Sequence, residues 1–305
     1  MKIVIPGGTG QVGRLLVRYF SGQGHQVLAL HRSSSAELTA ALAGSDVCIN
    51  LAGRSVNCRY GAENRREIFD SRIDTTRQLH EVMAGLGKPP RVWINASTAT
   101  IYRHALDRAM TESNGELGGN EPGAPDTWNF SIAVAKGWEE AFFSKVTPLT
   151  RQVAIRSAIT FSPDRGGAFD VLLGLVRHGL GGAQGSGEQF VSWIHEFDFV
   201  RAVDLLVARE DFAGVVNLAT PNPLRNREFM RGLREAWGAP VGLPSTEWMI
   251  ELGAWGMRTE SELVLKSRRV VPERLLAAGF VFEYPYWPEA ARELVGRWPI
   301  ARSAA

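Results

Sequence analysis

The chain has 305 residues, of which 45% are hydrophobic and 22% are charged, and its formal net charge is +2. This composition is ordinary for a globular protein with one large or two smaller domains, and so small a charge argues against a nucleic-acid-binding protein. The sequence has no apolar run that could span a bilayer, and because its first residues predict a strand and a glycine turn, we expect no signal peptide. Its only cysteines are Cys48 and Cys58. We therefore expect a cytoplasmic protein with reduced thiols that acts on a small molecule and binds neither nucleic acid nor membrane.

The first twenty residues combine a strand, a glycine-rich turn and a helix. Residues 2–5 are β-branched and apolar, which is typical of a buried parallel strand, and apolar residues recur at helical spacing up to residue 20. Between them, glycines at the spacing G-x-x-G-x-x-G let the backbone approach a pyrophosphate at the positive end of the helix. We favour a dinucleotide-binding turn over a turn without a ligand, because strand, spacing and helix occur together. Its candidate residues are Gly7, Gly8, Thr9, Gly10, Gln11, Val12 and Gly13.

A second strand is predicted over residues 26–30, and His31 and Arg32 follow it. In Rossmann folds the end of this strand meets the adenosine ribose, where an acid suits NAD and an arginine suits the extra phosphate of NADP. A guanidinium can bind that phosphate through paired hydrogen bonds. The alternative is a surface arginine without such a role, but the lack of an acid here favours NADP(H) over NAD(H).

Helices and strands continue to alternate after this point. The pattern predicts helices at 36–43 and 62–86 and strands at 46–51 and 91–96. Leu51, Ala52 and Gly53 end one strand with small residues, as needed where the backbone passes beneath a cofactor. Ser97 and Thr98 follow the next strand, at the edge where ligands of open parallel sheets bind. Their hydroxyls are candidates to hold a substrate oxygen, although an ordinary polar turn explains them equally well.

The second half of the chain predicts further helices at 128–143, 168–178, 199–209 and 227–237, and strands at 152–161, 190–195 and 215–218. Asp198 and Asn226 are expected to cap the helices that follow them. Residues 179–189 are rich in glycine, so ordering them costs entropy. We expect a mobile lid beside the nicotinamide end of the cofactor, with a rigid solvent-exposed loop as the alternative.

The segment after Ala239 is rich in tryptophan and suggests a small second domain over the carboxyl edge of the sheet. Its tryptophans are Trp248, Trp255, Trp287 and Trp298, and aromatic residues in helices belong more often to a core than to a pocket. Trp248 and Trp255 could instead supply an apolar wall to a pocket facing the lid.

Several motifs together resemble the extended short-chain dehydrogenase/reductase family, also described as NAD-dependent epimerase/dehydratase-like. They are Gly7-Gly8-Thr9-Gly10-Gln11-Val12-Gly13, Asn50-Leu51-Ala52-Gly53, Ala96-Ser97-Thr98 ahead of Tyr102, and Trp193-Ile194-His195 ahead of Asp198. Shorter matches, including Ser71-Arg72, Trp138-Glu139 and Arg274-Leu275, are similar to an atypical branch of that family. Some relatives in the branch carry sugar-epimerase or cell-division-inhibitor labels. The resemblance covers nearly the whole chain.

The resemblance implies an α/β fold, with a doubly wound parallel Rossmann sheet and a smaller C-terminal α/β substrate domain. Residues 1–165 and 193–222 would form the NADP-binding domain, and residues 166–192 and 223–300 the substrate or lid domain. Typical members have another strand just before the one at 46–51, but residues 33–45 leave room only for a helix and turns. We therefore expect one edge strand to be missing. The protein should be a monomer or homodimer that binds NADP(H) and a small-molecule substrate, with no metal.

The catalytic pair of the family does not occur in this sequence. Members use Tyr-x-x-x-Lys, in which the tyrosine is the general acid/base and the lysine lowers its pKa and holds the ribose. None of the five tyrosines here has a lysine four positions later. Counted from Trp138-Glu139, the pair falls at Ser131 and Ala135, or, shifted by one, at Ile132 and Lys136. A serine hydroxyl is a far poorer proton donor than a phenol.

Two functions are compatible with this sequence. One is an NADP(H)-dependent oxidoreductase or nucleotide-sugar epimerase/dehydratase-like enzyme with an altered acid/base group. In that enzyme Ser97 and Thr98 would orient the substrate, Ser131 or water would replace the tyrosine, and Lys136 would contact the cofactor. The other is a non-catalytic NADP(H)-binding sensor or regulator, for example in cell division, which the missing tyrosine favours.

Overall fold

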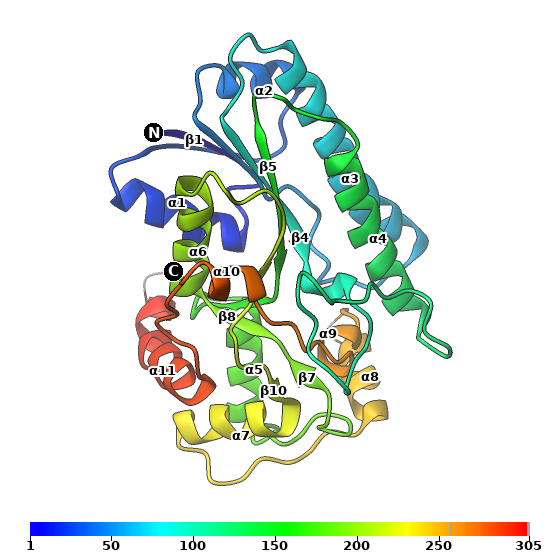
Figure 1. The fold of residues 1–305 in the computed structure, drawn as a ribbon. Helices are drawn as coiled ribbons and strands as arrows, with labels where there is room; N and C mark the ends of the chain where they lie inside the picture. The colour runs from blue at the N-terminus through cyan, green and yellow to red at the C-terminus, as the bar shows by residue number, and fades with distance from the viewer. Residues whose placement is uncertain (257, 304–305) are drawn as a thin grey trace.

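The computed structural model describes residues 1–256 and 258–303, and its centre is a parallel sheet of six strands in the order β2-β1-β3-β4-β5-β9 (Figure 1). The strands are β1 (Lys2–Pro6), β2 (Gln26–Leu30), β3 (Val47–Asn50), β4 (Val92–Thr98), β5 (Arg151–Ser157) and β9 (Gly214–Leu218). All five neighbouring pairs are parallel. The predicted Rossmann sheet is thereby confirmed.

Helices cover both faces of the sheet (Figure 1). They are α1 (Gln11–Gly22) and α6 (Glu196–Ala208) on one face, and α2 (Ser35–Leu42), α3 (Ala62–Gly85) and α4 (Asp126–Phe143) on the other. Because side chains alternate along a strand, adjacent residues of β1 enter different cores. Ile3 packs in the core that contains Leu16 of α1, whereas Val4 packs in the core that contains Leu79 of α3.

Only α2 and turns lie between β2 and β3, so the expected absence of one edge strand is confirmed for residues 33–45. Ser34 starts α2 with a capping box that it shares with Glu37. The sheet order places β2 and β3 on opposite sides of β1. This reversal is the kind of switch point at which open α/β sheets bind their ligands, and it lies next to the glycine turn.

The remaining elements form a smaller region, drawn mostly in the lower half of Figure 1. They are η1 (Ala99–Ile101), β6 (Ile159–Phe161), α5 (Ala168–Arg177), β7 (Phe190–Val191), β8 (Trp193–His195), β10 (Leu224–Arg225), α7 (Asn226–Trp237), α8 (Glu247–Gly256), α9 (Glu262–Leu265), α10 (Glu273–Ala277) and α11 (Trp287–Ser303). Trp287 stacks on Phe229 with ring centroids 4.1 Å apart and meets Trp193 edge-on at 5.0 Å. Trp287 and Trp298 are thus buried core residues, as predicted.

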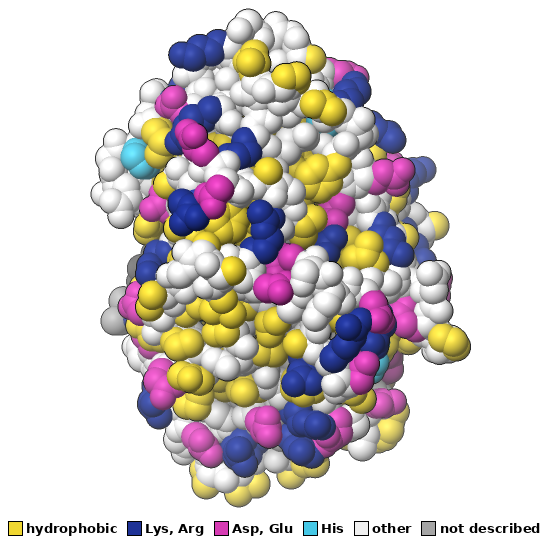
Figure 2. Space-filling model, viewed as in Figure 1, with side chains coloured by type: hydrophobic (Ala, Val, Ile, Leu, Met, Phe, Trp, Pro, Cys, Tyr) yellow, Lys and Arg dark blue, Asp and Glu magenta, His cyan; other side chains and the backbone are white. Residues whose placement is uncertain are grey.

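Two further observations concern the charged side chains on the surface and the length of the helices. On the face drawn in Figure 2, basic and acidic side chains are interspersed, in keeping with the net charge of +2. Among the described residues, none of the helices combines the length and the apolar character that crossing a membrane requires.

The predicted cap of α6 is wrong. The helix starts at Glu196, and its cap is His195, whose Nδ1 accepts the Phe197 N–H at 3.2 Å. Asp198 lies inside the first turn, fully buried, and accepts the backbone N–H groups of residues 283 and 284 at 2.8 and 2.9 Å. The partners of this carboxylate come from a segment about 85 residues further along the chain, so the local sequence cannot predict them.

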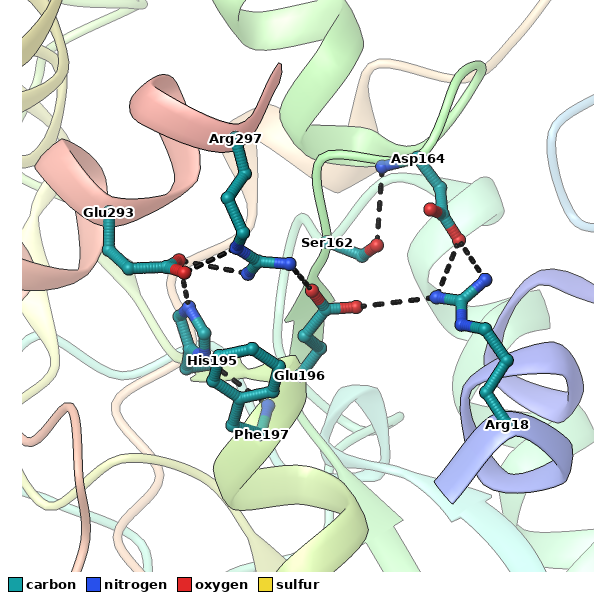
Figure 3. A network of polar contacts seen from close by, with 8 residues as sticks. All are labelled: Arg18, Ser162, Asp164, His195, Glu196, Phe197, Glu293 and Arg297. Carbon is teal, nitrogen blue, oxygen red and sulfur yellow. Dashed lines mark hydrogen bonds and ion pairs between the residues drawn. The ribbon is translucent and has the colours of Figure 1, made fainter. Parts of the chain in front are cut away.

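A polar network joins α1, the start of α6 and α11 (Figure 3). Arg297 bonds Glu293 on its own helix and Glu196 at 2.5 Å, and Glu196 also lies 3.7 Å from Arg18. Because Nδ1 of His195 accepts a backbone N–H, its ring proton lies on Nε2 and is donated to Glu293 at 2.9 Å. The network therefore ties the glycine-turn helix to the last helix of the chain.

This network predicts how stability depends on pH. Burial alone would raise the pKa of Glu293, but hydrogen bonds from His195 and Arg297 outweigh it and lower the pKa to about 2. A carboxyl with a lowered pKa stabilises the fold above its unfolded pKa of about 4.3, and that contribution is lost as the pH falls towards 2. We expect Glu293→Gln to lower the free energy of unfolding by about 1–3 kcal/mol at pH 7, with the difference shrinking steadily below about pH 4.

Urea unfolding at several pH values from 7 to 3 measures this difference. The matched control is Glu289→Gln on the same helix, because Glu289 is 56% exposed and pairs only loosely with Arg292 at 3.5 Å. It should change stability little at any pH. A cost of Glu293→Gln that stays constant over this range would contradict the expectation.

Candidate functional site

A cavity of about 320 Å³ connects the glycine turn to the ends of the central strands. Val12 and Leu51 line its turn side, and Ser97 and Thr98 line it at the end of β4. Ser131 of α4 lies in its wall together with residues of α9. The cavity therefore brings together candidates for cofactor and for substrate binding that are far apart in the sequence.

The glycine turn has the close contacts that a dinucleotide site needs. Gly7 has a φ of +81°, and a Cβ there would lie 2.5 Å from the carbonyl carbon of Leu51. A Cβ on Gly13 would lie 2.6 Å from the Gly7 carbonyl oxygen, so α1 packs directly on the turn. Gly10, at the helix N-cap, gives no side-chain cap, which leaves first-turn N–H groups available to an anion. These residues fit a dinucleotide diphosphate.

The end of β2 contacts the glycine turn through His31. The hydroxyl of Thr9 lies 3.2 Å from Nδ1 of His31, which joins the turn to the end of β2. Arg32 follows His31 and is exposed. On the other side of the turn, a Cβ on Gly167 would overlap the Gln11 amide, so Gly167 lies directly against that side chain.

Ser97 belongs to a buried network of hydrogen bonds. Its hydroxyl donates to Glu139 at 2.5 Å, and Glu139 pairs with Arg156 through both oxygens at 2.6 and 2.7 Å. Arg156 donates to the Tyr102 hydroxyl, which donates to Asn217, each at 2.9 Å. The single proton of the Ser97 hydroxyl is therefore already committed to Glu139.

Thr98 is better placed than Ser97 to hold a substrate. Its Oγ1 accepts the Thr100 N–H at 3.2 Å as the cap of η1. That bond leaves the hydroxyl proton free to be donated to an oxygen in the cavity. Of the two hydroxyls at the end of β4, the geometry favours Thr98 as the substrate contact and Ser97 as part of its support.

Of the two positions considered for the absent Tyr-x-x-x-Lys pair, only that of Ser131 and Ala135 faces the cavity. Ser131 and Ala135 line the cavity, whereas Ile132 packs against residues 118–119 and Nζ of Lys136 also lies towards Gly119. Consecutive residues of a helix point about 100° apart, so only one register can face the cavity. The cofactor contact expected of Lys136 is therefore not supported.

Ser131 has partners that the sequence did not reveal. Its hydroxyl donates to Oε2 of Glu262 at 2.5 Å and lies 3.5 Å from the hydroxyl of Tyr60. Glu262 pairs with Arg268 at 3.3 Å, and both side chains are buried. Burial raises the pKa of Glu262, and it raises that of Tyr60 to about 12. These residues come from segments 71 and 131 positions away, so no local motif could find them.

Arg72 is a cation in the cavity wall for which no carboxylate partner is found in residues 1–256 and 258–303. It donates to the Ile68 carbonyl at 2.9 Å, lies 5.1 Å above the Trp138 ring and packs on Gly53. Burial lowers its pKa to about 10, so it is still charged at neutral pH. Because a buried charge without a counter-ion is costly, this position suits an anionic group of a ligand.

The glycine-rich segment 179–189 is packed against its neighbours. The N–H groups of Gly182 and Gly185 donate to carbonyls in residues 243–245 at 3.0 and 2.7 Å, and Gln184 exchanges two hydrogen bonds with Asn226. A Cβ on Gly182 would lie 2.4 Å from backbone atoms of that segment. Glycine serves close approach here, and the predicted mobile lid is not supported. The predicted cap Asn226 is also wrong, since α7 starts at Asn226 and its amide bonds Gln184 instead.

The predicted tryptophan wall is wrong as well. Trp248 and Trp255 on α8 are 67% and 69% exposed, and neither lines the cavity between the turn and α4. The C-terminal part of that wall is formed by Glu262, Leu263 and Arg268.

Comparison with known proteins identifies two family models in the chain. Residues 3–123 match the NAD dependent epimerase/dehydratase family, and residues 246–294 match a domain of unknown function, DUF1731. The chain is 30% identical to the bovine (Bos taurus) epimerase family protein SDR39U1 over 97% of this chain and 100% of that protein. It is 27% identical to the epimerase family protein YfhF of Bacillus subtilis over 97% and 98% of the two chains.

A solved structure extends the comparison to three dimensions. The crystal structure of the human epimerase family protein SDR39U1 (isoform 2) with NADPH superposes with a TM-score of 0.86 at 28% identity, over 97% of this chain and 99% of that one. With the matching sequence motifs and sheet, these similarities show that the chain belongs to the NAD-dependent epimerase/dehydratase family of extended short-chain dehydrogenases/reductases.

Proposed function

We propose that the protein is an NADP(H)-dependent oxidoreductase or nucleotide-sugar epimerase/dehydratase-like enzyme that transfers protons without the usual tyrosine–lysine pair. The observation that carries this proposal is the cavity itself. It joins a turn that fits a dinucleotide to the free hydroxyl of Thr98 and to the Ser131–Glu262 pair. The human relative solved with NADPH supports the choice of cofactor.

Each part of the cofactor has a matching group in this chain. Gly7 and Gly13 would let the turn approach the diphosphate closely, and the N-terminus of α1 would face it. Arg32 would hold a phosphate on the adenosine ribose, and Arg72 would offset negative charge between Gly53 and the end of β4. When bound, the nicotinamide supplies or accepts a hydride. Thr98 would orient the substrate oxygen towards it.

The test is turnover of NADPH with a panel of aldehydes, ketones and nucleotide sugars. We expect oxidation of NADPH, or interconversion of a nucleotide sugar, with at least one of these classes. Tight binding of NADPH with no turnover of any class would favour the second candidate, a sensor or regulator. The lack of Tyr-x-x-x-Lys is the observation in favour of that alternative.

Arg32 predicts a measurable cofactor preference. NADPH should bind more tightly than NADH, and Arg32→Ala should narrow the difference by about 1–3 kcal/mol, because it removes charged hydrogen bonds to the phosphate. Titration of protein fluorescence with each cofactor measures both affinities. Arg66→Ala is the matched control, since it removes an exposed arginine of α3 that does not line the cavity. Equal affinity of the unmodified protein for NADPH and NADH would refute the assignment.

A further inference from the structure

We propose that Tyr60 is the proton donor and acceptor of this cavity, and that Ser131 and Glu262 form a proton relay behind it. The inference rests on the proposed function and assigns its missing acid/base group. It replaces the tyrosine that the family carries on the helix equivalent to α4 with a phenol that arrives from the loop before α3. Among the described residues, Tyr60 is the only tyrosine that lines the cavity.

The Tyr60 ring is held from several sides. Its backbone N–H donates to Oε1 of Glu260 at 2.6 Å, and the neighbouring Arg59 pairs with the same carboxylate at 3.1 Å. The ring meets Phe130 of α4 edge-on, with centroids 5.0 Å apart. The hydroxyl is thereby placed next to Ser131, which occupies the position of the absent tyrosine in the register that faces the cavity. A phenol fixed in this way needs no rearrangement before it can donate.

Hydrogen-bond directions make the three groups a connected path. A serine hydroxyl has one proton, so its direction depends on Glu262. When Glu262 is ionised, Ser131 donates to it at 2.5 Å; when Glu262 is protonated, the carboxyl group donates to Ser131, and Ser131 donates to the Tyr60 oxygen at 3.5 Å. In the protonated state the hydroxyl of Tyr60 therefore keeps its own proton for the cavity. The path runs from a phenol at the cavity surface, through an alcohol, to a carboxyl group that is buried.

The proposed proton transfer balances for the reduction of a carbonyl group. As hydride from the cofactor reaches the carbonyl carbon, the carbonyl oxygen takes the proton of Tyr60. Starting from protonated Glu262, the phenolate then takes the proton of Ser131, and Ser131 takes the proton of the Glu262 carboxyl group. The resulting carboxylate is held by Arg268 until it takes up one H⁺ from the solvent, the single proton that the reduction consumes. One O–H bond forms for each one that breaks, and the two electrons come from the hydride. Oxidation of an alcohol runs the same path in reverse.

The surrounding charges suit this role. Burial raises the pKa of Tyr60 to about 12; the hydrogen bond from Ser131 lowers it, and the negative charges of Glu262, Cys58 and Glu260 raise it further. The phenol therefore keeps its proton until a substrate oxygen becomes basic. Arg72 and Arg268 both interact electrostatically with the ionised phenol, so they stabilise the phenolate once it forms. This is the help that the lysine gives in the usual pair.

The other hydroxyl groups nearby are less suitable. Ser131 alone is a much weaker acid than a phenol. Tyr102 is 2% exposed, and its hydroxyl is already bonded to Arg156 and Asn217.

The test compares Tyr60→Phe, which removes one hydroxyl, with Tyr286→Phe, which removes the hydroxyl of a tyrosine that is 59% exposed. The probe substrate is 9,10-phenanthrenequinone, a reactive aromatic dicarbonyl, together with NADPH. We expect Tyr60→Phe to bind NADPH as the unmodified protein does but to lower kcat by about 100-fold or more, a typical loss for a general acid. Tyr286→Phe should change neither quantity.

A second variant tests the relay through its pH profile. Glu262→Gln can still accept the Ser131 hydrogen bond but cannot supply a proton. Because burial raises the pKa of Glu262, kcat for reduction in the unmodified protein should fall as the pH rises through that pKa. Glu262→Gln should be slower at low pH and should lack this fall. A purely structural role for Glu262 would leave the shape of the profile unchanged.

The outcomes separate this inference from the proposed function. Turnover that survives Tyr60→Phe within about threefold overturns the role of Tyr60 alone, since a general acid contributes far more than that. Unmodified protein that binds NADPH but reduces neither the probe nor the substrate panel overturns the proposed function, and the role of Tyr60 with it. Should Tyr60→Phe fail to fold or to bind NADPH, Ser131→Ala makes the same comparison. Full activity of Ser131→Ala, with the pH profile unchanged, overturns the relay.

Discussion

Replacing Gly7 with alanine should weaken NADPH binding by about 100-fold, because contacts this close cost several kcal/mol to relieve. The added Cβ would lie 2.5 Å from the carbonyl carbon of Leu51 and 2.7 Å from the nitrogen of Ala52, closer than real Cβ contacts. Both neighbours are backbone atoms, so the turn itself must move. The φ of +81° at Gly7 adds strain for any residue with a Cβ. The displaced turn can no longer cradle a diphosphate.

Gly22→Ala is the matched control, in the helix that follows the same turn. No atom lies within 4 Å of a Cβ at Gly22, and alanine is the better helix former by about 1 kcal/mol. This variant should bind NADPH normally and unfold at the same or slightly higher urea concentration. Fluorescence titration gives the affinities, and circular dichroism shows that Gly7→Ala is folded. Normal NADPH affinity in folded Gly7→Ala would show that the turn does not hold the cofactor.

The second large effect concerns the buried pair of Glu139 and Arg156. Glu139→Gln keeps the volume of the side chain but leaves the guanidinium without a counter-ion, in a place where both side chains are about one-tenth exposed. Removing one partner of a buried pair costs about 3–5 kcal/mol. We therefore expect a loss of that size in the free energy of unfolding, measured by urea denaturation.

Two comparison variants make this expectation specific. Asp211→Asn breaks the pair with Arg209 at 2.6 Å, in which the two side chains are 60% and 44% exposed. Its cost should stay below about 1 kcal/mol, since solvent screens such pairs. Replacing Glu139 and Arg156 together with methionine should cost less than Glu139→Gln alone. A double variant that is less stable than the single one would contradict the charge-based explanation.

Features encoded by neighbouring residues could be predicted from the sequence. The strand, the turn and α1 are specified within about twenty residues, through apolar spacing and glycines that no other residue could replace. The absence of one edge strand could likewise be predicted from the length of a segment, because residues 33–45 are too few to form both a helix and a strand. The preference for NADP(H) rests on Arg32 alone and is still a prediction.

Features that depend on distant segments could not be predicted. Which of Ser131 and Ile132 faces the cavity is decided by how α4 packs, since one step along a helix turns the side chain by about 100°. Tyr60 and Glu262 join Ser131 only because the loop before α3 and the C-terminal region meet over α4. The glycines of residues 179–189 predicted a mobile lid, whereas the segment is packed against its neighbours, and the reason is related. Glycine is used both for flexibility and for close packing, and only the neighbouring segment distinguishes the two uses.

The network of Figure 3 also means that one part of folding must wait until the end of the chain has been synthesised. Arg297 is made 101 residues after Glu196, the carboxylate that it pairs with. At common translation rates, Glu196 therefore has only the more distant Arg18 as a partner for roughly 5 to 20 s on the ribosome. In the finished protein that glutamate is only 4% exposed. The start of α6 therefore cannot be fully buried until the final helix emerges and packs against it. In a chain that ends before α11, the start of α6 stays exposed. Such a chain should be recognised by chaperones and proteases, even though all strands of its central sheet have been made.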